Sequence, residues 1–242
     1  MKTMRTISFA VAVILAVSLN ASATIVDLTT AGADGLINGA QFIQDNFEKS
    51  TGTGVFDPFV RIQNNGSEAG FNTDGGVQFE TKQGSWTHSI QLSDIPLCPD
   101  GDSYDFRLDI NEASNEPKLS LDVLKIYLAD VGDLDDYATE LNILTPAYDM
   151  DFLEDSVVLL DYSIGSGSGS GDMTVCIPVD ALGTDGSKYV YLYSEFGIYA
   201  GTDEGWTSSD GFEEWGIIPD VIPEPATMVL LGLGSVLLRK RK

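Results

Sequence analysis

The chain has 242 residues and is strongly acidic, with 37 aspartates and glutamates against 13 lysines and arginines and a formal net charge of −24 at pH 7. The two ends hold six of the basic residues and one of the acids, so the part between them carries a net charge near −29. Such a surface repels polyanions, which excludes nucleic acid and anionic lipid as partners. An aromatic content of 10% also excludes a disordered acidic chain.

Residues 1–23 have the three-part pattern of a secretory signal peptide. Lys2 and Arg5 give a positive start, residues 7–19 are apolar and uncharged, and Ala21-Ser22-Ala23 supplies the small residues of a cleavage site. The apolar run is too short for a membrane span. We therefore expect signal peptidase to cleave after Ala23, so that the exported chain begins at Thr24.

Residues 24–221 show the pattern of one acidic, all-β domain. Apolar residues from Tyr104 to Ile110 alternate with charged ones, which is typical of a strand with one face in water. Turn residues separate this strand from further strand-like runs at 56–62, 77–81, 86–92, 119–128, 157–164, 173–179 and 189–196. The pattern predicts a single antiparallel β-sandwich of jelly-roll type. A short helix is expected at 40–49 or 134–141, and the Gly-Ser segment 165–171 is expected to be a hairpin loop.

The chain has two cysteines, Cys98 and Cys176. In an exported protein, two cysteines are most simply one structural disulfide. Closing a loop of this length would stabilise the fold by roughly 4 kcal/mol in the chain-entropy description.

The residue pattern argues against catalysis. His88 is the only histidine, and it lies in a strand-like stretch with no nucleophile motif nearby. We therefore expect a protein that is not an enzyme. An acid-dependent glycan hydrolase or lyase stays open as an alternative, since that chemistry needs only two suitably spaced carboxyl groups and the body has 36.

Calcium is the cofactor that the acidic loops could hold, and otherwise we expect none. The candidate ligands are Asp130, Asp133, Asp135 and Asp136, with a second acidic group at 149–155. Neither group has EF-hand spacing, so solvated loops are the simpler interpretation. A carbohydrate-binding module, with or without calcium, is the second functional alternative. Trp206 is its best exposed aromatic candidate, because glycines and hydroxyl residues surround it.

The C-terminal segment 222–242 has three parts in order. Pro223-Glu224-Pro225 comes first, the uncharged run 226–238 follows, and the basic residues 239–242 end the chain. The prolines separate the body from the following helix. Thirteen residues make about 20 Å of helix at ~1.5 Å per residue, which is short of the ~30 Å hydrocarbon core of a bilayer. A basic end favours a cytoplasmic C-terminus.

This segment resembles the PEP-CTERM sorting signal of Gram-negative bacteria. The resemblance implies export through the inner membrane, a transient single-pass anchor, removal of the tail by an exosortase-type membrane protease, and delivery to the cell surface or the medium. Such proteins accompany exopolysaccharide and biofilm matrix, so the implied role is that of a surface or matrix protein. Some family schemes name the same tail after ice-binding proteins, which says nothing about this body.

Overall fold

The computed structural model describes residues 23–45, 56–165, 171–201, 205–209 and 211–219. Residues 1–22 of the predicted signal peptide, which include Ala21, lie outside these residues. The motif Pro223-Glu224-Pro225 and the predicted apolar helix 226–238 lie outside them as well. The first strand, β1 (Thr24–Asp27), begins at the residue that follows the predicted cleavage site. Within the described ranges, no helix has both the length and the apolar character needed to cross a membrane.

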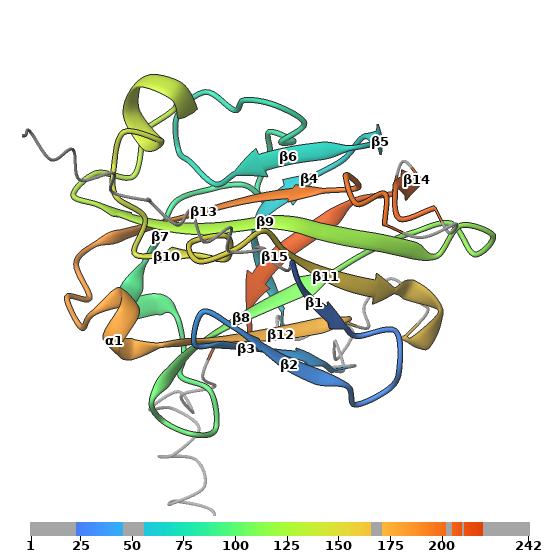
Figure 1. Ribbon diagram of the computed structural model, residues 1–242. Helices are drawn as coiled ribbons and strands as arrows, with labels where there is room; N and C mark the ends of the chain where they lie inside the picture. Colours follow the sequence, from blue (N-terminus) through green and yellow to red (C-terminus); the bar gives the residue numbers. More distant parts are fainter. Residues whose placement is uncertain (1–22, 46–55, 166–170, 202–204, 210, 220–242) are drawn as a thin grey trace, which may run out of the picture.

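The first large sheet has seven strands (Figure 1). Its main path runs through β1, β11 (Ser156–Asp161), β9 (Lys118–Ala129), β13 (Tyr189–Phe196) and β6 (Glu68–Phe71). Two short strands extend it, β10 (Tyr148–Asp149) on β9 and β7 (Ile90–Gln91) on β13. The pairs are antiparallel except β1 with β11, which is parallel.

The second large sheet has six antiparallel strands. Their order is β2 (Asp34–Ile37), β3 (Ala40–Gln44), β12 (Met173–Pro178), β8 (Ser103–Asp109), β15 (Glu213–Ile217) and β4 (Asp57–Ile62). A third, two-stranded sheet joins β5 (Asn65–Gly66) to β14 (Ser208–Ser209). Figure 1 shows the two large sheets as layers, with the small sheet at one end.

A single apolar core lies between the two large sheets. Buried side chains of β9 and β13, such as Leu121 and Leu192, belong to the same cluster as Phe106 of β8 and Trp215 of β15. Trp215 is fully buried, and its indole nitrogen donates to Ser194 Oγ at 3.1 Å. The all-β, largely antiparallel sandwich predicted from the sequence is confirmed.

The alternation along β8 is confirmed, but its charged face is not wet. Phe106 and Leu108 enter the core, whereas Asp105 and Asp109 point the other way and are nevertheless buried. The alternation of apolar and charged residues predicts which face of the sheet each side chain lies on. It does not predict whether other parts of the protein cover that face.

Four local predictions need correction. Residues 40–44 form a strand, not a helix, because Ala40, Phe42 and Gln44 are buried alternately. Only Ile90–Gln91 of 86–92 is strand, and η1 (Leu92–Asp94) follows it. Residues 77–81 are not a strand, since Phe79 and Glu80 form a turn, with a positive φ of 54° at Phe79, and Thr81 makes only an isolated bridge to Ile62.

The fourth correction concerns the Gly-Ser segment. β11 and β12 belong to different sheets, so residues 165–171 connect the sheets and do not close a hairpin. The helix expected at 134–141 exists in part, as the π-helical turn η2 (Tyr137–Leu141). Two further short helical segments are η3 (Tyr162–Ile164) and α1 (Val179–Leu182).

Candidate functional site

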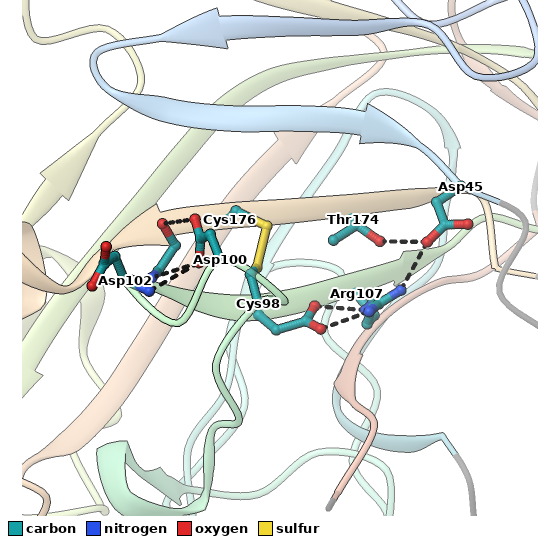
Figure 2. The surroundings of a disulfide bond; sticks show 9 residues. Asp45, Cys98, Asp100, Asp102, Arg107, Thr174 and Cys176 are labelled. Atoms are coloured by element: carbon teal, nitrogen blue, oxygen red, sulfur yellow. Dashed lines mark hydrogen bonds and ion pairs between the residues drawn. A yellow bond between two sulfur atoms is a disulfide. The ribbon is translucent and has the colours of Figure 1, made fainter.

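Cys98 and Cys176 form a disulfide (Figure 2). Cys176 lies on β12, and Cys98 lies in the loop before β8, with 6.1 Å between the two Cα atoms. The bond therefore joins two segments that are 78 positions apart, on the outer face of the second sheet.

An ion-pair group continues this outer face (Figure 2). Arg107 donates twice to Asp105, both at 2.6 Å, and once to Asp45 at 3.0 Å, and Thr174 Oγ1 also donates to Asp45. Burial raises the pKa of Asp105, and Arg107 opposes that rise. These contacts hold β3, β8 and β12 together, so the group is structural in character.

The four aspartates of the expected calcium loop do not face one another. Asp130 accepts from Lys188 Nζ at 2.5 Å, and Asp135 Oδ2 accepts from the backbone of Gly76 at 2.9 Å. Asp136 caps η2 by accepting from Thr139 N, while Asp133 is exposed. Across the described parts of the chain, no group of three or more His, Cys, Asp or Glu side chains is placed so that it could hold a metal ion.

The prediction that Trp206 is exposed is wrong, because only 4% of its surface is accessible. Its ring packs in a small cluster with Val157, Leu159 and Tyr199 on the first sheet. The carbonyl of Trp206 accepts from the backbone and the hydroxyl of Ser120, which fixes the polar loop against the sheet. The glycine and serine neighbours of Trp206 therefore indicate a tight turn and not an exposed ring. The buried ring offers no open face to a sugar.

His88 is half-buried, and its backbone holds it in place. Its N–H donates to Phe59 O at 3.0 Å, and its carbonyl accepts from Asn72 Nδ2 at 3.3 Å. The His88 backbone thus links β4 of the second sheet to Asn72, which follows β6 of the first.

The tyrosines of β13 contribute to an aromatic group on the outer face of the first sheet. Tyr193 stacks on Tyr137 with ring centroids 4.3 Å apart, and the half-exposed ring of Phe79 meets Tyr137 edge-on at 5.5 Å. Burial raises the pKa of Tyr191 to about 12. These rings mostly pack against one another, so they cover the sheet.

The described surface includes the following open hollows. One of about 610 Å³ lies beside the disulfide and is lined in part by Leu97, Asp102 and Asp180. A second, of about 500 Å³, lies between residues 115–118 and the Trp206 loop, and a third, of about 290 Å³, lies next to Tyr148. None of them contains His88 or the aspartates of the 130–136 loop.

The most unusual polar group is one that the sequence analysis missed. Glu68, Glu112 and Glu213 have accessible fractions of 3%, 4% and 0%, and Glu213 lies within hydrogen-bonding reach of both others. Burial is the main cause that raises the pKa of Glu68 and, much further, that of Glu213. Their positions, scattered over 145 residues, gave no sequence signal beyond Glu213 preceding the core residue Trp215.

Comparison with known proteins gives one match. The family model of the PEP-CTERM protein-sorting motif matches residues 221–242, which confirms the resemblance drawn from Pro223-Glu224-Pro225 and the segments after it. No curated protein and no solved structure matches the chain. The chain is therefore an exported protein whose C-terminus addresses it to an exosortase, and the match says nothing about the β-sandwich itself.

Proposed function

We propose that this chain is a non-enzymatic protein of the cell surface or of the exopolysaccharide matrix, delivered there by its C-terminal signal. The observation that carries the proposal is the sorting-motif match at residues 221–242. Signal peptidase would release the chain after Ala23, and an exosortase-type protease would remove the tail. The folded body would then remain outside the cell or on its surface.

Two features of the body support this role. The Cys98–Cys176 disulfide suits an oxidising compartment outside the cytoplasm. The high negative charge keeps the domain soluble and repels nucleic acid, while neutral polysaccharide remains a compatible neighbour.

Sorting is tested by changing the motif in the native host. Replacing Pro223, Glu224 and Pro225 together by alanine should leave a longer, unprocessed protein in the inner membrane, detected by immunoblotting of cell fractions. Thr227→Ala in the same tail is the matched control and should be processed normally. Normal processing of the triple variant would contradict the proposed route.

A role in holding polysaccharide directly is tested separately, with the purified exported protein on a glycan array in Ca²⁺ and in EDTA. We expect no glycan to bind in either condition. Binding to a defined glycan would replace this proposal by the carbohydrate-module alternative. Cleavage of a glycan during the incubation would instead support the hydrolase or lyase.

A further inference from the structure

Strand β1 is held at its first residue. It lies at an edge of the first large sheet, where it pairs with β11 in parallel and Thr24 lies opposite Ser156. Thr24 N donates to Asp155 O at 3.1 Å, and Thr24 Oγ1 donates to Oε1 of Glu154. The amino nitrogen of Thr24 is therefore fixed beside the turn that precedes β11.

Docking of β1 also closes one side of the sandwich. Val26, from the middle of β1, is buried in the core between the sheets. A Cβ atom at Gly35 of β2 would lie 2.7 Å from Val26 Cγ2, so the edge strands of the two large sheets are in close contact here. Leu28 N donates to Leu159 O at 2.9 Å, which continues the pairing past β1. An interaction that holds the first residue of β1 therefore stabilises this side of the core.

The turn that receives Thr24 is rich in negative charge. Four carboxyl groups lie within seven positions, at Asp149, Asp151, Glu154 and Asp155. Among the described ion pairs, Lys125 is the basic side chain that reaches this turn, and it pairs with Asp149 at 3.3 Å. Glu154, which contacts Thr24, is half-buried at the other end of the turn. A positive charge on Thr24 would thus meet a complementary partner.

We infer that cleavage after Ala23 creates this charge, as an ammonium group on Thr24 that Glu154 and the carbonyl of Asp155 capture. The inference rests on the proposed processing by signal peptidase. Water hydrolyses the peptide bond between Ala23 C and Thr24 N, so Ala23 leaves as a carboxylate and Thr24 keeps the ammonium group. An α-amino group has a pKa of roughly 7.7–8.0, so most of it is charged at pH 7.

The new group has more donors than the amide that it replaces. In the uncleaved chain, Thr24 N carries one hydrogen, and Asp155 O accepts it. The ammonium group carries three, so one keeps the carbonyl of Asp155 and the others are available to the carboxylate that Thr24 Oγ1 already contacts. Hydrogen bonds between two charged groups are shorter and stronger than neutral ones.

Removal of the signal peptide is therefore a switch that acts on the fold. Before cleavage, β1 docks through neutral hydrogen bonds and apolar contacts. After cleavage, an ion pair is added at its first residue, so the exported protein is more stable than its precursor. The gain is modest, because Thr24 and Glu154 are half-exposed and water screens the pair.

The test moves the ammonium group without removing it. An insertion of Gly-Ser between Ala23 and Thr24 keeps the residues before the cleavage site and places the new terminus two positions ahead of β1. Both proteins are exported with the native signal peptide and purified, and their masses give the first residue. At pH 7 and low salt, the inserted form should unfold about 2–4 °C below the wild type.

Glu154→Gln identifies the partner of the ammonium group. Its amide oxygen can still accept from Thr24 Oγ1, so the variant should fold. It should lower the unfolding temperature of the wild type by about the same 2–4 °C and should have no further effect in the inserted form. Glu116→Gln, in the exposed loop before β9, makes the same charge change and should alter neither form.

Two results would overturn the inference. One is an inserted form that unfolds at the wild-type temperature. The other is a pair of losses, from the insertion and from Glu154→Gln, that simply add, because independent effects do so.

A mass that begins at another residue would instead contradict the proposed cleavage after Ala23. The comparison is then made with protein freed from a fusion partner whose removal leaves Thr24 first, with the disulfide formed. Equal unfolding temperatures of that protein and its Gly-Ser form would overturn the capture itself.

Discussion

The chain has two acidic regions of opposite character, the loop at 130–136 and the seam glutamates, which are the buried Glu68, Glu112 and Glu213. The loop concentrates four aspartates in seven positions, but Asp130, Asp133 and Asp135 are exposed to water. The seam glutamates lie far apart in the sequence and are almost completely buried. A dense run of acids in water costs little and binds weakly, whereas a few buried acids require a partner.

This difference explains why the density of acidic residues in the sequence did not locate the most unusual carboxyl groups. In the loop, individual aspartates already accept hydrogen bonds from Lys188, Gly76 and Thr139, as aspartates in turns commonly do. At the seam, the same carboxyl groups lie in a low dielectric and pair with one another. The environment of a carboxyl group, rather than the number of acids nearby, sets its pKa.

The largest loss of stability is expected for a substitution of Trp215, a core residue close in sequence to Glu213. Trp215→Ala removes a fully buried ring two positions after Glu213, and we expect a loss of about 3–5 kcal/mol in the free energy of unfolding. Phe152→Ala is the control, because that ring is 76% exposed and its loss should change stability by no more than about 0.5 kcal/mol. Denaturant unfolding measures both, and equal losses would contradict the contrast between buried and exposed regions.

A smaller effect is expected for the ion pair next to the seam. Arg61 donates to Glu214, and its guanidinium lies over the rings of Trp86 and Phe212 at 4.1 and 4.4 Å. Glu214→Gln should cost about 2–4 kcal/mol, because the Glu214 side chain is only 6% exposed.

Asp130→Asn breaks the exposed pair with Lys188 and should produce no measurable change in the same unfolding experiment. If Glu214→Gln and Asp130→Asn lowered the free energy of unfolding by similar amounts, burial would not distinguish the Arg61–Glu214 pair from the Lys188–Asp130 pair.

The smallest effect is expected for the dependence of stability on pH. The pKa of Glu213 is raised well above its ordinary value of 4.5, and burial raises that of Asp151 from 3.8 to about 6. The folded state therefore binds more protons than the unfolded state, so stability is full below the unfolded pKa and falls as pH rises through the folded pKa.

Unfolding temperatures should thus decrease from about pH 4 to pH 6 through Asp151, and Glu213 should add to the decrease as its own carboxyl group ionises. Asp151→Asn and Glu213→Gln should each make the curve flatter, while Asp135→Asn should follow the wild type. A wild-type stability that rises with pH over this range would contradict the buried, protonated state of Glu213.

The sequence predicted the parts of this protein that depend on local pattern. The alternation at 104–110, the long run of β9 and the order of residues in the tail each depend on neighbours along the chain. Residues 40–44 were misassigned because Gln41 and Gln44 weaken the period-two pattern, although Phe42 and Ala40 face the core. The seam glutamates could not be predicted, since only tertiary pairing brings Glu68, Glu112 and Glu213 together.

The most direct measurement is the ionisation of the Glu213 carboxyl group, followed by infrared difference spectroscopy of the exported protein against Glu213→Gln. The account predicts a protonated carboxyl band that persists above the ordinary glutamate pKa of 4.5 and is absent from the variant, because Glu213 is fully buried beside two other carboxyl groups. A Glu213 that ionises at or below that pH would contradict it.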